Sequence, residues 1–541
     1  MNEKPQGIAA GCTRMLTAAI RGLRRAAANL ARGVRSGTAR ASVPARAESG
    51  AEAGQRSVRS ASPARFHPLL FLFLLGAIWL VNYPGRVNPD SLEQLIGAAF
   101  PAYRTDWHSP IVAWLWNVPA PLLGQPAAAL LVQSLLIAFG GAIVSRGGPR
   151  NGWTAAGLVL ELLWKGALVG MAGVILKDVF LLGTLLAAWG SLRLWLGSRS
   201  RIWLAATAAF LFVAAVVRPP NVVMFAAAAA LVLPFLCQGW GQYLRRFGLA
   251  CACLLAAASI GAAIDRHLLR AIPAHPEVQV IIFDIAGTSV GSGANLFTRM
   301  PGWSAPALPD LHRCYQPALW DSFAPWGDCR AYVVATRAAV ARSGGAAFAR
   351  WWLGELLAHP LAYAGHRLAY MRIAITDGTT EPSYLSTGPA ALNGKDSREI
   401  LRAAAAGRMP LSMLQVWDEE RMPAFVSRLT LLMFWLPWLP ALAFLACLAF
   451  LGSALNDRRR GRPPTPALLA AAMGVGNVAM MAVFGAASSP RYFLPLLLGA
   501  YLAATAELQR RGARSEPSPH CCPGFDPRCT PGTPPLGHRR G

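Results

Sequence analysis

The chain has 541 residues, of which 54% are hydrophobic and only 14% are charged, and its formal net charge is +25. Its mean hydropathy is +0.37. Ala, Leu, Trp and Phe recur in apolar blocks of roughly 15 to 25 residues, the length that crosses a bilayer. One soluble core rarely grows large enough to bury that many apolar helices. We therefore predict an all-α polytopic membrane protein and not a soluble globular one.

Residues 1–65 are rich in Arg, Ala, Ser and Gly and contain no continuous apolar stretch of the length that a signal peptide needs. We predict a basic, disordered cytoplasmic tail there, and a second disordered cytoplasmic tail over 509–541. Positive charge beside a membrane is typical of contact with anionic lipid. We therefore expect membrane lipids, and no nucleic acid, among the partners of the chain.

The apolar blocks that follow predict about ten transmembrane helices. A shorter apolar stretch, 110–123, is interrupted by Pro119 and Pro121, and this pattern predicts an interfacial or re-entrant piece. The predicted spans are 66–84, 126–144, 153–175, 179–197, 202–217, 221–237, 247–264, 427–452, 464–486 and 491–508.

Arginine in the connecting loops predicts the orientation of these spans, because cytoplasmic loops carry an excess of Lys and Arg. With the N-terminus inside, every second loop is basic. We therefore predict a multi-pass protein of a bacterial-type inner membrane with both termini cytoplasmic. The predicted parts between the tails are an N-terminal transmembrane region over 66–264, a mixed extracytoplasmic domain over 265–426 between the seventh and eighth spans, and a C-terminal transmembrane region over 427–508.

The predicted outside domain contains three further features. Cys314 and Cys329 are separated by 14 residues in an oxidising compartment, which favours a disulfide. The glycine-rich stretch 283–297, FDIAGTSVGSGANLF, has no dinucleotide or phosphate-loop spacing and predicts a turn-rich loop. Residues 346–372 are amphipathic at helical spacing and predict one helix lying on the outer leaflet or across the mouth of a site.

Ionisable groups converge on the predicted outer face. Charged groups near hydrocarbon cost a few kcal/mol each unless they pair or face water, so they are candidates for function. Carboxylates set against Lys and Arg from other loops would bind an anion beside an acid or base. The first outside loop, 85–125, contributes Asp90, Glu93, Asp106 and His108, and later turns contribute Lys177, Asp178, Arg218 and Arg491.

Each residue also has a structural interpretation when it is taken singly. Lys177 and Asp178 fit an interfacial anchor and a helix cap, Arg218 fits contact with lipid phosphates, and His108 fits the cap of a turn. Their joint placement favours a site. An anion held by Arg and Lys near the membrane surface suggests a polyprenyl phosphate, and a nearby carboxylate suggests a base for glycosyl transfer. The sequence also leaves open that an aspartate pair holds a divalent metal ion on that phosphate.

The motifs YPGRVNPDSLEQ, DWHSP, LKDVFL, VRPPN and SPRYFLPLLLGAYL occur in this order from about residue 83 to 495. Together they resemble the large integral-membrane glycosyltransferases of the GT-C superfamily, which use polyprenyl-phosphate-linked sugars. The resemblance implies a glycan, lipid or protein acceptor outside the membrane. It implies that Asp90 is the leading catalytic residue with Asp106 and His108 second, that Lys177, Arg218 and Arg491 bind the donor phosphate, and that Glu93, Asp178 and Tyr492 support them.

Two departures from the family pattern affect these expectations. The predicted outside domain falls between the seventh and eighth spans, whereas several members carry theirs at the C-terminus, so the resemblance does not identify the acceptor. The first loop offers Asp90 followed later by Asp106-Trp107-His108, without adjacent acidic residues, so either aspartate can be the base.

The alternative function is a transporter or flippase of a lipid-linked or anionic solute, which would place ionisable residues at mid-membrane. Glu161 and Lys165 in the third predicted span are the main such pair, and an intrahelical salt bridge also explains them.

Overall fold

The computed structural model describes residues 66–87, 89–144, 170–304, 308–325, 327–376 and 438–515. These residues are mostly helical and contain isolated β-bridges but no β-strand, so the predicted helical class is confirmed. They all belong to one compact unit, Ser62–Gly541. The predicted tail 1–65, the pair Glu161 and Lys165, and most of the tail 509–541 lie outside the described residues.

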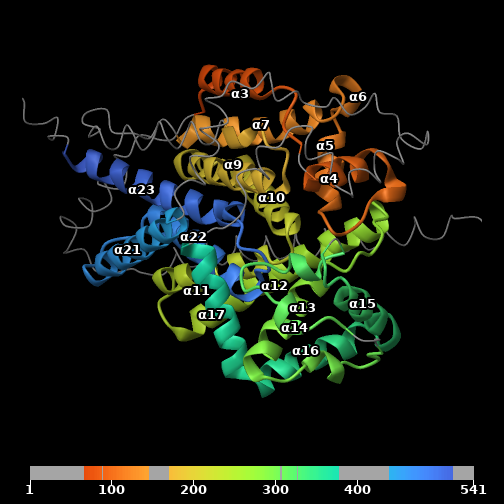
Figure 1. Cartoon of the computed structure of the whole chain (residues 1–541). Coiled ribbons are helices and arrows are strands. Elements are labelled where there is room, and N and C mark those ends of the chain that lie inside the picture. The colour runs from red at the N-terminus through yellow and green to blue at the C-terminus, as the bar shows by residue number, and fades with distance from the viewer. Residues whose placement is uncertain are drawn as a thin grey trace, which may run out of the picture. The chain divides into compact units, whose positions relative to one another are not determined.

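The first half of the chain folds into helices joined by short turns (Figure 1). They are α3 (Pro68–Asn82), α4 (Pro89–Ala99), η1 (Pro101–Tyr103), α5 (Pro110–Asn117), α6 (Ala120–Leu123), α7 (Ala127–Val144), α9 (Lys177–Ser198), α10 (Arg201–Val217), α11 (Asn221–Leu236), α12 (Trp240–Ala263) and the π-helical turn η3 (Ile264–Leu268).

The second half continues in the same way. Its elements are α13 (Glu277–Ser292), η4 (Leu296–Arg299), α14 (Leu311–Cys314), η5 (Asp321–Phe323), α15 (Ala331–Ser343), α16 (Gly345–Ala358), α17 (Pro360–Thr376), α21 (Leu439–Arg459), α22 (Pro466–Phe484), η10 (Pro490–Phe493) and α23 (Leu494–Ser515).

Five described helices are long and apolar enough to cross a membrane: α7, α9, α12 continued through η3, α21 and α22. Shorter apolar helices, α3, α10 and α11, accompany them. In α9, 78% of the apolar window is buried among neighbouring helices, whereas in α12 only 6% is buried. Water does not favour such an exposed apolar surface, and a surface of this kind is typical of a helix in contact with lipid.

The predicted spans that fall within the described residues are helical over most of their length. Spans 126–144, 179–197 and 464–486 coincide with α7, α9 and α22 to within a few residues. The stretch 110–123 forms two short helices, α5 and α6, that meet at Pro119. Most of the predicted span 153–175 and the beginning of 427–452 lie outside the described residues.

The packing of these helices brings distant parts of the chain together. Helix α7 packs between α3 and α9, α9 packs on α10, and α22 packs against α11, α21 and α23. At one end of this bundle the last turns of α21 and α23 are joined, because Arg510 Nη1 lies 2.5 Å from Asp457 Oδ2. Arg193 of α9 donates to Gln509 Oε1 at 2.9 Å at the same end. The arginine-bearing ends of α9, α21 and α23, which the arginine pattern assigns to one side, therefore meet.

A second group of helices, α13 to α17, packs around α13 (Figure 1). The prediction of a turn-rich loop over 283–297 is wrong, because α13 is a regular helix up to Ser292. Its glycines are positions of close contact: a Cβ on Gly287 would lie 2.1 Å from the His366 ring, and one on Gly291 would lie 3.1 Å from Ala362. Small residues that admit a neighbouring helix do not break α13.

The single amphipathic helix predicted over 346–372 is also corrected. It is two helices, since α16 ends at Ala358 and α17 begins at Pro360. Proline at the first position of α17 cannot continue the hydrogen-bond ladder of α16. A spacing of seven residues within one helix would place His359 and His366 on the same face. His359 instead caps α16 and His366 lies inside α17, so the two histidines belong to different helices.

Candidate functional site

The predicted site residues lie at ends of helices that backbone contacts hold together. Arg86, in the turn after α3, forms a parallel bridge with Val174, just before α9. The Arg86 N–H donates to Gly173 O at 2.7 Å, and the Ile175 N–H donates to Arg86 O at 2.9 Å. The Ser91 hydroxyl of α4 also donates to Ile175 O. These bonds place the first turns of α4 and α9 side by side.

The motif VRPPN ends α10 and starts α11. Arg218 is the C-cap of α10, and Asn221 is the first residue of α11. Because two prolines between them cannot donate backbone hydrogen bonds, carbonyls of the last turn of α10 need other donors. Asn221 Nδ2 supplies one, to Ala214 O at 2.6 Å. This bond fixes the turn that presents the Arg218 side chain.

The motif SPRYFLP forms η10 at the start of α23, and it too is held from two sides. Asn477 Nδ2 of α22 donates to Tyr492 O at 3.2 Å. Ala487, three residues before η10, forms an antiparallel bridge with Leu319, which lies between α14 and η5. Arg491, between these two attachments, is therefore fixed relative to α22 and to the segment before η5.

Eight residues from these elements form what we call the helix-end cluster: Asp90, Glu93, His108, Lys177, Asp178, Arg218, Arg491 and Tyr492. Its centre is a chain of ion pairs. Arg491 Nη1 lies 3.0 Å from Asp90 Oδ2, and Arg491 Nε lies 3.9 Å from Asp178 Oδ2. Arg218 Nη2 lies 2.5 Å from Asp178 Oδ1. Asp178 thus joins two arginines that are 273 residues apart in the sequence, residues 218 and 491.

Tyr492 orients both guanidinium groups. The Arg218 guanidinium carbon lies 4.4 Å from the centre of the Tyr492 ring, and that of Arg491 lies 5.0 Å from it. Arg491 Nη2 also donates to the Tyr492 hydroxyl at 3.1 Å. Stacking on an aromatic face leaves the planar fork of an arginine free to point sideways at a phosphate or carboxylate.

His108 forms the second branch of the helix-end cluster. Its Nε2 lies 3.4 Å from Glu93 Oε2, and its Nδ1 lies 2.9 Å from Lys177 Nζ. Burial raises the pKa of Glu93, but the hydrogen bond and charge of His108 and the charge of Lys177 outweigh this effect, so the pKa lies below its ordinary value. Glu93 is therefore held as a carboxylate beside His108.

Accessibility separates the carboxylates of the cluster. The Asp90 side chain is 27% exposed and that of Glu93 is 45% exposed, whereas that of Asp178 is 4% exposed. An incoming molecule can reach Asp90 and Glu93, while Asp178 is buried between the two arginines. Arg218 Nε is a buried donor without a hydrogen-bond partner among the described residues. This donor is unsatisfied and is available to one more acceptor group.

Asp106, the other predicted base, has a different position. Its Oδ1 accepts the backbone N–H of Ala274 at 2.5 Å. Its own N–H donates to Ile272 O at 3.1 Å, next to the parallel bridge between Thr105 and Ile272. Asp106 therefore joins the first loop to the connection before α13 and contacts none of the arginines of the cluster in the described hydrogen bonds and ion pairs.

Among the described residues, no group of three or more His, Cys, Asp or Glu side chains is arranged to hold a metal ion. Asp90 and Asp178, the carboxylates closest to the arginines, are each engaged by a guanidinium group. The donor set of the cluster therefore fits an anion better than a divalent cation.

The structure contains a second polar network, which is built around three buried residues, Asp284, His366 and Arg367. We call it the domain cluster: Asp284, Tyr315, Trp352, His366 and Arg367. Arg367 Nη2 lies 2.5 Å from Asp284 Oδ1, and His366 Nε2 lies 3.4 Å from the same oxygen. Trp352 Nε1 donates to Asp284 Oδ2 at 3.2 Å. The side chains of Asp284 and His366 are both fully buried.

The protonation states of the domain cluster follow from burial. Burial is the main cause that lowers the pKa of His366 and raises the pKa of Tyr315 to about 12. Neutral His366 can donate through Nε2 to Asp284 and accept through Nδ1 from the Tyr315 hydroxyl, which lies 2.7 Å away. Because Asp284 lies in the stretch expected to be a loop, a buried helix position could not be inferred for it.

The domain cluster is linked to the segment that carries Arg491. Arg367 Nη1 donates to Gly485 O at 2.5 Å, and the Tyr370 hydroxyl donates to Ala487 O at 3.0 Å. A Cβ on Gly485 would lie 2.1 Å from the Tyr370 hydroxyl oxygen, so only glycine allows this approach. Cys314, beside Tyr315, is joined to Cys329 by a disulfide. The helices α13 to α17 therefore help to position Arg491.

No protein-family model, no curated protein and no solved structure matches this chain.

Proposed function

We propose that this chain is a membrane glycosyltransferase of the GT-C type, which moves a sugar from a polyprenyl-phosphate-linked donor to an acceptor on the extracytoplasmic face. The observation that carries the proposal is the helix-end cluster. Arg218 and Arg491 stack on one tyrosine beside an accessible carboxylate, Asp90, at the ends of apolar helices. A lipid-linked phosphate at the membrane surface requires such an arrangement.

Each group of the cluster has a role in this reaction. Asp90 takes the proton from the acceptor hydroxyl as its oxygen attacks the anomeric carbon, and the bond between that carbon and the phosphate oxygen breaks. Arg218, Arg491 and Lys177 stabilise the charge on the departing polyprenyl phosphate. Since Arg491 lies 3.0 Å from Asp90, it can hold the phosphate next to the base.

The remaining groups support these roles. Asp178, nearly buried, orients Arg218 and lies near Arg491. Glu93 and His108 hold Lys177 at the edge of the cluster and form a second route for a proton. Asp106 accepts from the Ala274 backbone, which favours Asp90 over Asp106 as the base.

The proposal includes the finer topology: about ten spans, both termini in the cytoplasm of a bacterial-type inner membrane, and the outside domain between the seventh and eighth spans. The arginine pattern supports it, and so does the meeting of α9, α21 and α23 at their arginine-bearing ends. On this topology the helix-end cluster, at the opposite ends of α9 and α23, faces outward.

The test compares two isosteric variants, Asp90→Asn and Asp106→Asn. Cells with and without the protein are compared by mass analysis of their surface polysaccharide, lipid A and glycoproteins, and the sugar that is lost identifies the acceptor. Restoration of that sugar by Asp106→Asn but not by Asp90→Asn is the expected result, with a fall in transfer rate of about 10²- to 10⁴-fold for Asp90→Asn. Full transfer by a stably accumulated Asp90→Asn protein would remove Asp90 from the role of base.

A further inference from the structure

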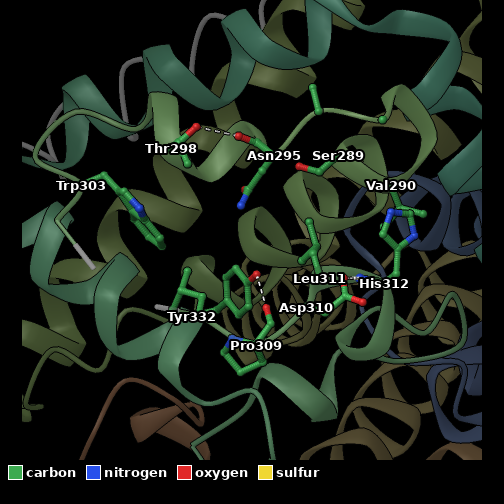
Figure 2. A pocket seen from close by; sticks show the side chains of 13 residues that line it. Ser289, Val290, Asn295, Thr298, Trp303, Pro309, Asp310, Leu311, His312 and Tyr332 are labelled. Atoms are coloured by element: carbon green, nitrogen blue, oxygen red, sulfur yellow. Dashed lines mark hydrogen bonds between the residues drawn. The ribbon is translucent and has the colours of Figure 1, made fainter. Parts of the chain in front are cut away.

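The outside domain contains a pocket of about 460 Å³ that shares no residue with the helix-end cluster or the domain cluster. One wall is the end of α13 and the η4 turn, with Ser289, Asn295 and Thr298, and the other is the segment 308–312 with Tyr332 of α15. Trp303 completes the lining (Figure 2). The volume lies within the usual range of small-molecule sites, roughly 300–1,000 Å³.

Hydrogen bonds fix the α13 wall of the pocket. Gly293 ends α13 in the left-handed conformation, with φ +71°, which favours glycine. The Ser289 hydroxyl accepts the Leu296 N–H at 3.1 Å, and Asn295 Oδ1 accepts the Phe297 N–H at 3.2 Å. The turn that carries Asn295 and Thr298 is therefore formed before any ligand binds.

The opposite wall is fixed in a similar way. The Tyr332 hydroxyl donates to Pro309 O at 2.9 Å, and Asp310 Oδ1 accepts the His312 N–H at 3.1 Å. The ring of Phe297 packs against Tyr332, with 4.9 Å between ring centres, and joins the two walls. The disulfide from Cys314 follows directly after this wall and restricts its movement.

The lining chemistry points to a neutral, hydroxylated ligand. It contains hydroxyl, amide, carboxyl and imidazole groups from Ser289, Thr298, Asn295, Asp310 and His312, but neither Lys nor Arg. A site for phosphate or carboxylate would place arginine or lysine in the lining. A ligand with several hydroxyl groups can donate to the carboxylate and accept from the amide.

Two side chains are directed at the space itself. Figure 2 shows the indole of Trp303 and the amide nitrogen of Asn295 pointing toward the region that Leu311 and Tyr332 close. Asn295 is exposed, and among the described residues its Oδ1 and its backbone carbonyl accept hydrogen bonds while its amide nitrogen has no protein partner, so the nitrogen is open to a ligand. An aromatic face beside a free amide donor fits a pyranose ring, which has an apolar C–H face and a polar edge.

We propose that this pocket binds one neutral pyranose unit of a glycan. The Trp303 indole stacks on the C–H face of the sugar, the Asn295 amide donates to a ring hydroxyl, and the Asp310 carboxylate accepts from another. No covalent step occurs there. The pocket belongs to the domain whose segment 318–320 pairs with 486–488, just before Arg491. A bound glycan would therefore be held by the part of the chain that positions the helix-end cluster.

The test uses the full chain in lipid nanodiscs, which avoids competition from sugar-headed detergents. The probes are neutral methyl pyranosides and, as the anionic comparison, methyl glucuronide and methyl phosphate, and binding is followed by saturation-transfer NMR at millimolar concentration. We expect at least one neutral pyranoside to bind and the phosphate not to bind at the pocket.

Two variants locate the binding. Trp303→Ala should weaken it by about tenfold, because the apolar contact is lost. Asn295→Asp keeps the oxygen that accepts the Phe297 N–H and removes the donor, so it should weaken binding by about fivefold. The matched control is Trp240→Ala, which removes an indole that is 78% exposed at the start of α12 and should leave binding unchanged.

Absence of binding by every neutral pyranoside, or unchanged binding by Trp303→Ala, would overturn the proposal. Preference for the anionic probes would overturn it as well. The measurement needs no donor and no transfer, so its failure leaves the comparison of Asp90→Asn with Asp106→Asn unaffected.

Discussion

The helix-end cluster and the domain cluster contain the same kinds of side chain, yet they differ in exposure. In each, an aspartate pairs with an arginine and a histidine lies next to a carboxylate. Asp90 in the first is 27% exposed, whereas Asp284 in the second is fully buried. Residue types alone therefore do not distinguish a site from a structural network. Access for a ligand distinguishes them.

The two clusters also differ in how their aspartates are surrounded. In the domain cluster, Asp284 is engaged by Arg367, His366 and Trp352, so an incoming molecule would have to break a buried network. Buried Arg218 Nε and buried Arg367 Nε both have no hydrogen-bond partner among the described residues, so an unpaired arginine donor does not separate the clusters. The partly exposed carboxylate of Asp90 does separate them, because a ligand can reach it.

The largest expected effect concerns the stability of the domain cluster. Asp284→Asn leaves Arg367 buried without its carboxylate, which should lower the free energy of unfolding by roughly 3–5 kcal/mol. Asp90→Asn, at a partly exposed pair, should change it by about 1 kcal/mol or less. The measurement is the temperature at which each purified variant loses its monodisperse peak in size-exclusion chromatography. Equal losses for the two variants would contradict the distinction between the clusters.

The next effect concerns the disulfide beside the domain cluster. Replacing Cys314 and Cys329 together by Ser removes a cross-link that closes a loop of 15 residues, which should cost about 3 kcal/mol of stability. Because Cys314 precedes Tyr315, the domain cluster should loosen while the helix-end cluster keeps its ion pairs. Thermal stability and sugar transfer are measured together. Lost transfer with unchanged stability would show that the disulfide acts on the site directly, and Cys253→Ser, an exposed free cysteine, is the control.

The smallest expected effect is a pH dependence of stability. His366 lies against Asp284, Arg367 and Tyr315, and its pKa is below the ordinary value of 6.5, mainly because of burial. The folded state therefore binds fewer protons than the unfolded state, and its stability is lost as the pH falls from 6.5 through the folded pKa. Glu93, whose pKa lies below 4.5, stays mainly charged between pH 7 and about pH 5.

The variant His366→Gln tests this difference. Glutamine can donate to Asp284 and accept from Tyr315 without taking up a proton, so the loss of thermal stability between about pH 7 and pH 5 should be smaller than in the unchanged chain. The unfolding temperature is measured across this range for both proteins. Identical slopes would mean that His366 is not the group that titrates.

The sequence was informative where a pattern is local. Apolar blocks predicted α7, α9 and α22 to within two residues at each end, because the length of a membrane span is set by the bilayer. The prolines of VRPPN and the arginine of SPRYFLP marked ends of helices, and these ends do meet in the structure. The glycine-rich pattern wrongly predicted a loop where α13 forms, because a sequence does not distinguish glycines that permit close helix packing from glycines that form turns.

By itself, therefore, the sequence determined a helical chain with helices long and apolar enough to span a membrane, and a set of charged residues at their ends. Only the tertiary structure decided which of these residues touch. It paired Asp90 with Arg491, turned Asp106 to the Ala274 backbone, and buried Asp284 with His366 and Arg367. The physical reason is that a charge pattern records which groups must avoid hydrocarbon, whereas their partners depend on helix packing between residues hundreds of positions apart.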